Sequence, residues 1–393
     1  MTALHVVLPA GVDDPSTPSG GNRYDRRACQ ELAALGWHIV EHPVDGGWPR
    51  PEAGELTRLA AVLSSVPDGA LILLDGLVAC AAPELVVPAS MRLRLAVLVH
   101  LPLVDEAGDA DLDARERETL RAAASVVATS DGAARRLSTL HDLDGVRVAA
   151  PGVDPAPLAP GTPEGSRLLC VAAVTPRKAQ DLLVTALASL TDLDWSCDFV
   201  GALDRDPAYT ARVTSAAAQL DGRVNFAGPL AGADLDAAYA AADLLVLPSH
   251  AETYGMVVTE ALARGVPVLA TDVGGVPEAL GWAPPEAGGT PAEAGGTPGK
   301  TVGTPGEAVG TPGEAVGTRR GHREVAKTAA DAGLRPGILV PPGSPPALSG
   351  ALRRWLTQPE TRVNLRVAAA ARRSTLDGWD TTARALAAAL EAL

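Results

Sequence analysis

Residues 249–280 read SHAETYGMVVTEALARGVPVLATDVGGVPEAL and predict a loop, a helix, a strand and a Gly-rich turn in succession. The apolar run at 244–247, just ahead of them, predicts a strand buried on both faces, as in a parallel sheet. A helix is expected over residues 255–264, and Gly265 ends it as a glycine just past a helix C-terminus does. The next strand is expected at 266–270. This alternation predicts an α/β fold with a doubly wound parallel sheet.

Two glutamates of this unit are candidate ligand-binding residues. Glu252 lies in the loop ahead of the helix, and Glu260 lies on the helix itself. Carboxylate oxygens only accept hydrogen bonds and suit paired hydroxyls, whereas a helix start favours anions through its N–H groups and its dipole. In doubly wound sheets, ligands bind at the carboxyl ends of the strands. The unit therefore predicts a site for a sugar nucleotide.

The E-x7-E spacing of Glu252 and Glu260 closely resembles the signature of family 4 retaining glycosyltransferases, the glycosyl transferases group 1. The resemblance implies the GT-B fold, in which two Rossmann-like doubly wound domains face each other across a cleft. It also implies that Glu252 contacts hydroxyls of the donor sugar and that Glu260 binds the ribose diol. The donor-binding residues expected between them are Tyr254, Gly255, Met256 and Val257.

A pair of cations is expected to neutralise the donor diphosphate. An apolar strand at Leu168–Val174 and a turn at Thr175 and Pro176 place Arg177 and Lys178 at the carboxyl edge of the sheet. A guanidinium can hold phosphate oxygens in bidentate fashion, and an ammonium adds charge. The pair resembles the phosphate-binding R-K pair of the family. It would stabilise charge on the leaving diphosphate.

The amino-terminal half supplies two glycines close to the first strand. A strand is expected at His5–Leu8, Gly20 and Gly21 fall in the loop after it, and a helix then ends at Gly36. The loop lacks the GxGxxG pattern, which argues against a dinucleotide cofactor. Gly20 and Gly21 resemble the Gly-rich loop that the family places near donor and acceptor. A flexible turn is the alternative interpretation.

A histidine and a short motif complete the expected site. His100 ends the apolar strand Leu95–Val99. It matches the histidine that the family places against the donor sugar, where it would orient hydroxyls or stabilise positive charge without acting as a base. The segment Asn225–Leu230 resembles the family motif near the nucleotide base, and the resemblance implies that Gly228 and Leu230 bind the donor.

The length of 393 residues fits two domains, because a single core rarely grows that large. The predicted boundaries are 1–153 for an acceptor domain and 161–375 for a nucleotide-sugar donor domain, joined by the Pro-rich linker Pro151–Pro160. The resemblance implies that a last helix, 376–393, packs back on the first domain. Trp379 would anchor that crossover or pack locally.

An insert at 284–320 interrupts the donor domain with a seven-residue repeat whose best copies read GTPGEAV. Each full copy carries proline and glycine and few large apolar side chains, so a coiled coil is excluded. The composition predicts a disordered surface loop, with an interaction tether as the alternative.

The net charge of −14 argues against nucleic acid as a partner. Two arginine clusters could nevertheless contact a lipid surface peripherally or could simply be solvated helix faces: Arg23, Arg26 and Arg27, and Arg115, Arg117 and Arg121. No apolar run reaches the roughly 18 residues that span a bilayer, and no signal peptide is expected. A cytoplasmic location is expected, and four scattered cysteines without a CxxC pattern fit the reduced thiols of a cytoplasmic protein.

No metal is predicted to be required, because the histidines lack metal-site spacing and the D-x-D pattern recurs too often in this acidic chain to be informative. No cofactor is expected beyond the nucleoside-diphosphate sugar, which is a substrate. The predicted activity is that of a retaining hexosyltransferase acting on an acceptor hydroxyl of a glycan, lipid or small molecule. The alternatives are a sugar-nucleotide epimerase of the same fold and a catalytically silent sugar-nucleotide-binding protein.

Overall fold

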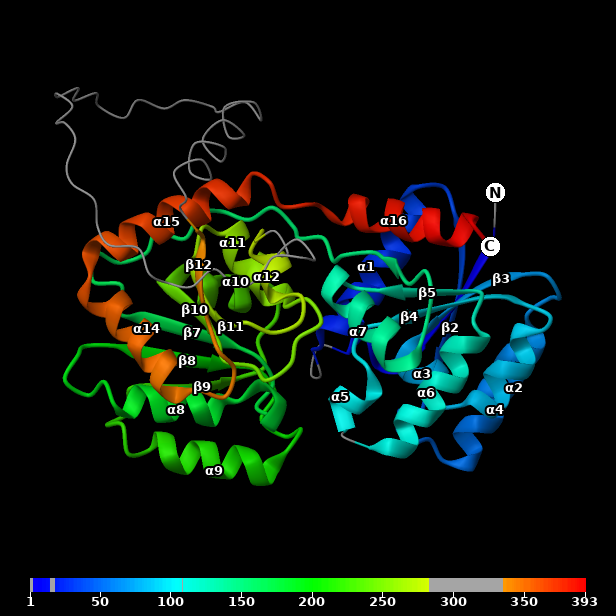
Figure 1. The fold of residues 1–393 in the computed structure, drawn as a ribbon, viewed down its shortest axis with the longest axis horizontal. Coiled ribbons are helices and arrows are strands. Elements are labelled where there is room, and N and C mark those ends of the chain that lie inside the picture. The colour runs from blue at the N-terminus through cyan, green and yellow to red at the C-terminus, as the bar shows by residue number, and fades with distance from the viewer. Residues whose placement is uncertain (1–2, 15–17, 108, 283–334) are drawn as a thin grey trace.

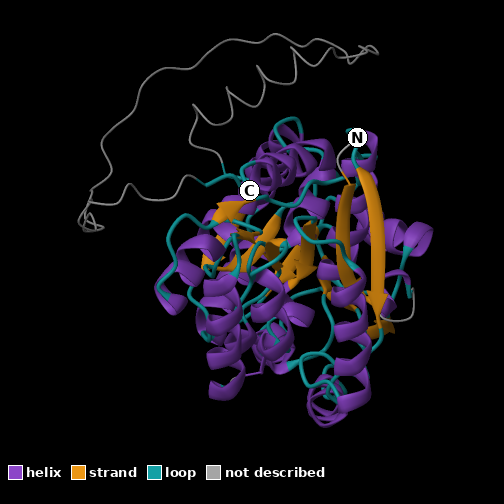
Figure 2. Cartoon of the chain, turned by 90° about the vertical axis from the view of Figure 1, so that its right-hand side faces the viewer, coloured by secondary structure: helices purple, strands orange, loops and turns teal. Residues whose placement is uncertain are grey.

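The computed structural model describes residues 3–14, 18–107, 109–282 and 335–393. The chain forms two α/β lobes that lie next to each other, each built on a six-stranded parallel sheet (Figure 1). Helices flank the strands in both lobes (Figure 2). The predicted insert at 284–320 lies outside the described residues. Within the described part of the chain, no helix has both the length and the apolar character needed to cross a membrane.

The first sheet has the strand order β2-β1-β3-β4-β5-β6. The direction of the order reverses between β1 and β3, so the loops after these two strands flank a topological switch point. The strands are β1 (Ala3–Pro9), β2 (His38–Val44), β3 (Leu71–Asp75), β4 (Arg94–Val99), β5 (Ser125–Ala128) and β6 (Arg147–Val148). The helices are η1 (Ala10–Asp13), α1 (Gly20–Ala34), α2 (Ala53–Ser65), α3 (Gly76–Ala79), α4 (Pro83–Ser90), α5 (Leu103–Ala107), α6 (Ala110–Ala122) and α7 (Asp131–His141).

The second sheet has the order β12-β11-β10-β7-β8-β9, and its direction reverses between β7 and β10. This is the strand order of the dinucleotide-binding fold. The strands are β7 (Arg167–Val171), β8 (Ser196–Val200), β9 (Val224–Gly228), β10 (Leu244–Leu247), β11 (Val268–Thr271) and β12 (Gly337–Val340). The helices are η2 (Pro176–Lys178), α8 (Gln180–Ala188), α9 (Pro207–Ala217), α10 (Gly232–Ala241), α11 (Met256–Ala263), α12 (Val276–Ala279), α14 (Pro345–Thr357) and α15 (Pro359–Arg373).

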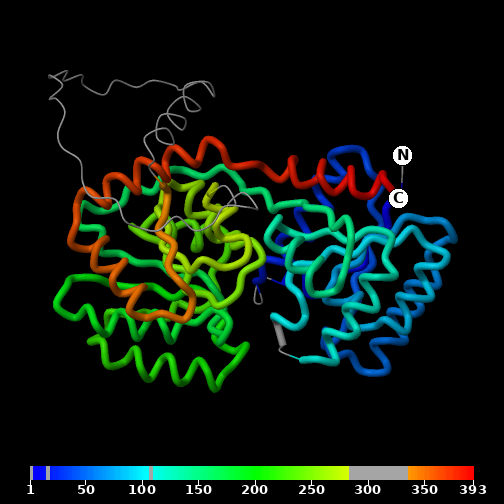
Figure 3. The backbone as a smooth tube through the Cα atoms, in the orientation of Figure 1, coloured from blue at the N-terminus to red at the C-terminus, as the bar shows by residue number. Residues whose placement is uncertain are grey.

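The last helix, α16 (Trp379–Glu391), returns from the second lobe to the first, as the red end of the tube in Figure 3 shows. It packs in the same apolar core as β1 and α1, with Leu386 and Leu390 fully buried. Trp379 is 3% exposed and makes an edge contact with Tyr24, their ring centroids 5.8 Å apart. The crossover thus buries apolar surface of the second lobe's terminal helix in the first lobe's core.

Several local expectations were wrong, among them the strand expected at 266–270, which is β11 at 268–271. Gly20 and Gly21 lie in the first turn of α1 instead of a loop, because the Ser19 side chain caps the helix by accepting the Asn22 N–H at 3.0 Å. Helix α11 begins one residue later than predicted, at Met256. Strand β7 spans 167–171 and is shorter than expected.

Candidate functional site

The loops after β7 and β10 flank the switch point of the second sheet and are bonded to each other. The Lys178 Nζ donates to Glu252 Oε1 at 2.5 Å. The His250 N–H donates to the Arg177 carbonyl at 2.8 Å, and Arg177 Nη1 donates to the Ala251 carbonyl at 3.1 Å. Arg177, Lys178 and Glu252, predicted from segments 74 residues apart, therefore converge at one edge of the sheet.

Glu252 is a buried carboxylate held in its charged form. Burial by itself would raise its pKa, but the charges of Lys178 and Arg177 and hydrogen bonds from Lys178 and Ser249 outweigh burial and lower the pKa. The Ser249 hydroxyl donates to Oε1 at 2.7 Å. An ionised carboxylate beside two cations gives this edge both the acceptors that sugar hydroxyls need and the positive charge that a diphosphate needs.

Glu260 lies on α11 with both carboxylate oxygens engaged. Tyr239 donates its hydroxyl to Oε2 at 2.8 Å, and Arg23 of the first lobe donates Nη1 to Oε1 at 2.5 Å. Arg23 also contacts Asp154 at 3.2 Å. Burial, followed by the negative charge of Glu260, raises the pKa of Tyr239 well above its ordinary value, so its hydroxyl remains a donor.

Gly255 sets the start of α11. It occupies the N-cap position with φ of +86°, a left-handed conformation that favours glycine. The first N–H groups of a helix have no acceptor within the helix, so Met256 and Val257 stand where backbone donors can meet an anion. A Cβ built on Gly20 would lie 3.5 Å from the Met256 sulfur, which places the start of α1 against the start of α11. We call this contact, together with the Arg23–Glu260 ion pair, the interlobe junction.

His100 follows β4 and is held by two carboxylates. Its Nε2 lies 2.7 Å from Asp25 Oδ1 and 3.5 Å from Asp75 Oδ2. Burial lowers the pKa of His100, but the charge and hydrogen bond of Asp25 and the charge of Asp75 overcome it and raise the pKa to about 9. A Cβ on Gly21 would lie 3.3 Å from the imidazole, so a glycine lets α1 approach the ring closely.

The remaining predicted donor residues lie farther into the second lobe. Gly228 ends β9, and Leu230 packs on the apolar cluster that also contains Met256 and Val257. Tyr254 is 9% exposed within that cluster, and burial raises its pKa to about 12. Its side chain is therefore mostly a core element, and its backbone is the part placed next to Gly255.

Further contacts join the lobes beside the junction. The Ser130 hydroxyl donates to the Thr253 carbonyl at 2.5 Å, and the Asp131 N–H donates to Glu278 Oε2 at 2.9 Å. Burial and the charge of Asp131 raise the pKa of Glu278. The loop that carries Glu252 is thus bonded to the start of α7 in the first lobe.

Sequence reasoning missed Arg23, Asp25, Asp75 and Tyr239. Asp75 had a usable signal, because it is the polar residue that ends the buried run LILLD of β3. Asp25 lies four residues after Gly21 and so shares its helix face. Arg23 had none, since its partner is 237 residues away in sequence.

The arginines of the two predicted basic clusters are occupied by carboxylates. Their partners are Glu260 and Asp154 for Arg23, Asp13 and Glu41 for Arg26, Glu31 and Asp154 for Arg27, Glu84 for Arg115, Asp113 for Arg117, and Asp142 for Arg121. Local neutralisation favours the interpretation of solvated helix faces over a lipid-binding surface.

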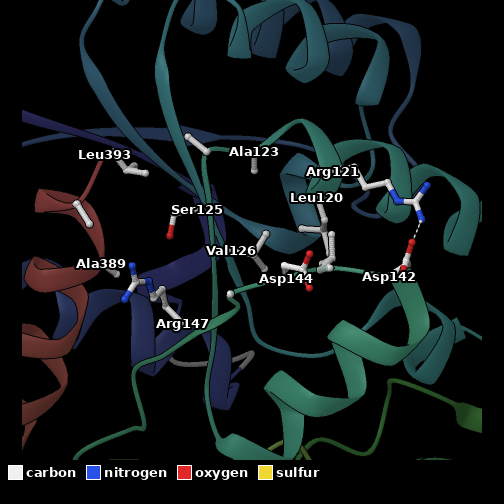
Figure 4. Close-up of a pocket in the computed structure, with 14 residues that line it drawn as sticks. Leu120, Arg121, Ala123, Ser125, Val126, Asp142, Asp144, Arg147, Ala389 and Leu393 are labelled. Atoms are coloured by element: carbon white, nitrogen blue, oxygen red, sulfur yellow. Dashed lines mark hydrogen bonds and ion pairs between the residues drawn. The ribbon is translucent and has the colours of Figure 1, made fainter.

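A cavity of about 350 Å³ lies away from this site (Figure 4). Ser125 at the start of β5, Arg147 at the start of β6 and Leu393 line it. It therefore opens at the amino ends of the strands, the edge opposite to the one where parallel sheets bind ligands. None of the predicted site residues lines it.

The second lobe matches a known family. Residues 161–282 match the family model of glycosyl transferases group 1. A D-inositol 3-phosphate glycosyltransferase of Kineococcus radiotolerans is 31% identical over 293 residues, which are 69% of this chain and 57% of that protein. One from Frankia alni is 34% identical over 199 residues, covering 42% of this chain and 46% of its own length. The chain spans about half the length of the curated relatives that it matches.

Solved structures share the whole architecture. Sucrose-phosphate synthase from Thermosynechococcus elongatus superposes with a TM-score of 0.71 at 20% identity, covering 99% of this chain and 98% of that one. Anabaena HepE in complex with UDP-glucose superposes with a TM-score of 0.69 at 16% identity over 100% of both chains. At these identities the likeness concerns the fold, and it confirms the predicted pair of Rossmann-like lobes. Residues 161–282 therefore match glycosyl transferases group 1, and the two lobes together form the GT-B fold.

Proposed function

We propose that this chain is a retaining glycosyltransferase that moves a sugar from a nucleoside-diphosphate sugar to an acceptor hydroxyl. The observation that carries the proposal is the convergence of Arg177, Lys178 and Glu252 at the switch point of the second sheet. Ligands of doubly wound sheets bind at such points. The family match of the same lobe supports the assignment.

The donor is held mainly by the second lobe in this proposal. Glu260 on α11 binds the ribose diol, and the start of α11 at Met256 and Val257 offers N–H groups to the phosphates. Glu252 accepts hydrogen bonds from the sugar hydroxyls. Gly228 and Leu230 border the base, while His100 reaches the sugar from the first lobe.

The reaction breaks the bond between the anomeric carbon and the diphosphate oxygen and forms a bond from that carbon to the acceptor oxygen. The acceptor attacks from the face that the diphosphate leaves, and a phosphate oxygen takes the hydroxyl proton. Arg177 and Lys178 stabilise the charge that grows on the leaving group, which is electrostatic catalysis. Glu252 stays charged because its pKa is lowered, so it can balance positive charge on the sugar ring. No side chain acts as nucleophile.

We propose a uridine diphosphate sugar as the donor, because Anabaena HepE, of the same fold, is solved with UDP-glucose. An inositol phosphate is the first acceptor to test, since the curated relatives are named for D-inositol 3-phosphate. The ion-paired arginines give no reason to extend the proposal to a lipid surface.

Transfer is proposed to need no metal, since two cations already stand where the diphosphate would lie. Activity should survive EDTA. Complete loss that Mn²⁺ or Mg²⁺ restores would contradict this part of the proposal.

The test of the function is a thermal-shift screen of UDP-, GDP- and ADP-sugars, followed by an assay of free nucleotide. A donor at 100 times its dissociation constant should stabilise the fold by about 2.7 kcal/mol. Acceptor-dependent nucleotide release supports the transferase. Binding without release would indicate a silent binding protein, and interconversion of two sugar nucleotides without acceptor would indicate an epimerase.

A further inference from the structure

The carboxylates around His100 all meet one edge of its ring. Asp25 from α1 and Asp75 from the end of β3 both approach Nε2, at 2.7 and 3.5 Å. Both carboxylates are nearly fully buried, at 5% and 6% exposure. Asp75 is the last residue of β3, and Asp25 lies on α1, the helix between β1 and β2, so the cluster sits near the switch point of the first sheet.

This geometry settles which ring nitrogen carries a proton. Asp25 makes the close contact at 2.7 Å, and its carboxylate when ionised can only accept, so Nε2 donates to it and is an N–H in either charge state of the ring. The other nitrogen, Nδ1, has no hydrogen-bond partner among the described residues, and the side chain keeps 18% of its surface exposed. The ring is therefore anchored on its buried edge and open on the other.

We propose that Asp25 and Asp75 are positioning residues, which grip His100 through Nε2 and so present its Nδ1 to the substrate side of the interlobe junction. The contact of Nδ1 with an oxygen of the donor sugar rests on the proposed function. The hold of Asp25 and Asp75 on Nε2 is independent of that function.

The grip is itself rigidly supported. Asp75 Oδ1 accepts the N–H groups of Leu77 and Val78, at 2.7 and 3.2 Å, which fixes the carboxylate at the start of α3. Tyr24 packs its edge against the imidazole with ring centroids 5.1 Å apart. A ring held from several sides loses little further freedom when substrate arrives, and such pre-organisation is what positioning contributes to catalysis.

The grip also determines what His100 can do. With Asp25 and Asp75 beside it, its pKa is raised to about 9, so near neutral pH the ring is an imidazolium. Both nitrogens then donate, and Nδ1–H can orient a sugar oxygen but cannot take a proton from the acceptor. Asp25, Asp75 and Tyr24 are the titratable groups that face the ring from α1 and β3.

The test is nitrogen-15 NMR of the imidazoles in the full chain, with the His100 signal assigned by its absence in His100→Gln. In the wild type, we expect His100 to titrate well above an ordinary histidine and to keep a proton on Nε2 at every pH. In Asp25→Asn the titration should shift down by at least one pH unit, and in Asp75→Asn by less. Asp13→Asn is the matched control, because Asp13 pairs with Arg26 elsewhere on α1, and it should leave the signal unchanged.

Steady-state kinetics provides a second test, because a purely structural role for Asp25 would not lower kcat selectively. Asp25→Asn should lower kcat by on the order of ten- to a hundredfold while KM for the donor changes little, as expected when orientation is lost. The Asp75→Asn variant keeps the inference testable if Asp25→Asn folds poorly.

Two results would overturn the inference. One is a His100 titration that is unaltered in both Asp variants. The other is a rise in melting temperature with Mn²⁺ or Zn²⁺ in the wild type but not in Asp25→Asn, because the ligand atoms of Asp25, Asp75 and His100 lie within 4.8 Å of one another and would then be a metal site. Failure of the proposed function would give a different result: the wild type would not turn over any donor, while the NMR titrations of His100 would still behave as expected.

Discussion

Arg23 on helix α1 of the first lobe donates a 2.5 Å hydrogen bond to Glu260 on helix α11 of the second. Tyr239 occupies the other carboxylate oxygen of Glu260. A ribose diol that binds Glu260 must therefore replace Arg23 or Tyr239. Donor binding and the ion pair between the lobes are thereby coupled, because they draw on the same carboxylate.

Removing Arg23 tests this coupling. Arg23→Ala should lower the free energy of unfolding by only about 1 kcal/mol, because its guanidinium is partly exposed. The same change should tighten donor binding, since the ribose no longer competes with an arginine. Urea unfolding measures the change in stability, and calorimetric titration with the donor measures the change in affinity. Arg26→Ala, which loses pairs with Asp13 and Glu41 away from the junction, is the control, and weaker binding in Arg23→Ala would show that Arg23 contacts the donor instead.

Removing Lys178 should damage turnover and stability together. Lys178→Ala is expected to lower kcat by about a hundredfold, the scale for loss of a charge-stabilising donor. It also leaves the buried Glu252 without its closest cation, which should cost about 3 kcal/mol of unfolding free energy. In the double variant Lys178→Met/Glu252→Gln, stability should recover while turnover does not. Recovery of turnover would remove Lys178 from the mechanism.

The two glutamates should separate by kinetic effect. Glu260→Ala should act on donor affinity with kcat nearly unchanged, because a ribose contact is the same in the ground and transition states. Glu252→Gln should lower kcat, because its contact follows a ring that gains positive charge. Steady-state kinetics on an identified donor checks both, and wild-type behaviour in both variants would remove the basis for the site.

Much of the fold was predictable because local sequence patterns determine where its strands and helices begin and end. Buried apolar runs such as Leu244–Leu247 match strands to the residue, and the glycine at 265 ends its helix with φ of +68° as expected. Gly20 and Gly21 were misplaced because one capping serine outweighed the loop-like composition around them. The cap is a side-chain contact that glycine content does not reveal.

Only the part of the site that the second sheet contributes was predictable from the sequence. Arg177, Lys178 and Glu252 each follow a strand of the second sheet, so order along the chain was enough to group them. The partners of His100 and Glu260 come from α1, β3 and α10, and they meet only when the strands, helices and lobes are assembled. Long-range ion pairs leave no spacing pattern in a sequence.

The cluster around His100 predicts a dependence of stability on pH. Because the pKa of His100 is raised to about 9, the residue contributes its full stabilisation below about pH 6.5. This stabilisation is lost as the pH rises through about 9. Burial and the charge of Asp25 raise the pKa of Asp75 to about 7, which acts in the same direction over a lower range. The stability advantage of the wild type over Asp25→Asn should therefore shrink steadily from acid pH to about pH 10 in urea unfolding. Asp13→Asn should show no such trend, and an advantage that grows with pH would contradict the assignment.

The most direct measurement of the central claim is a proton NMR time course of the anomeric signals, with the donor and acceptor that the thermal-shift and release assays select. The account predicts that the donor signal declines only when acceptor is present, and that a new glycoside appears with the same anomeric configuration as the donor sugar. A product of opposite configuration would contradict the retaining mechanism. Conversion of the donor to a second sugar nucleotide without acceptor would contradict the transferase itself.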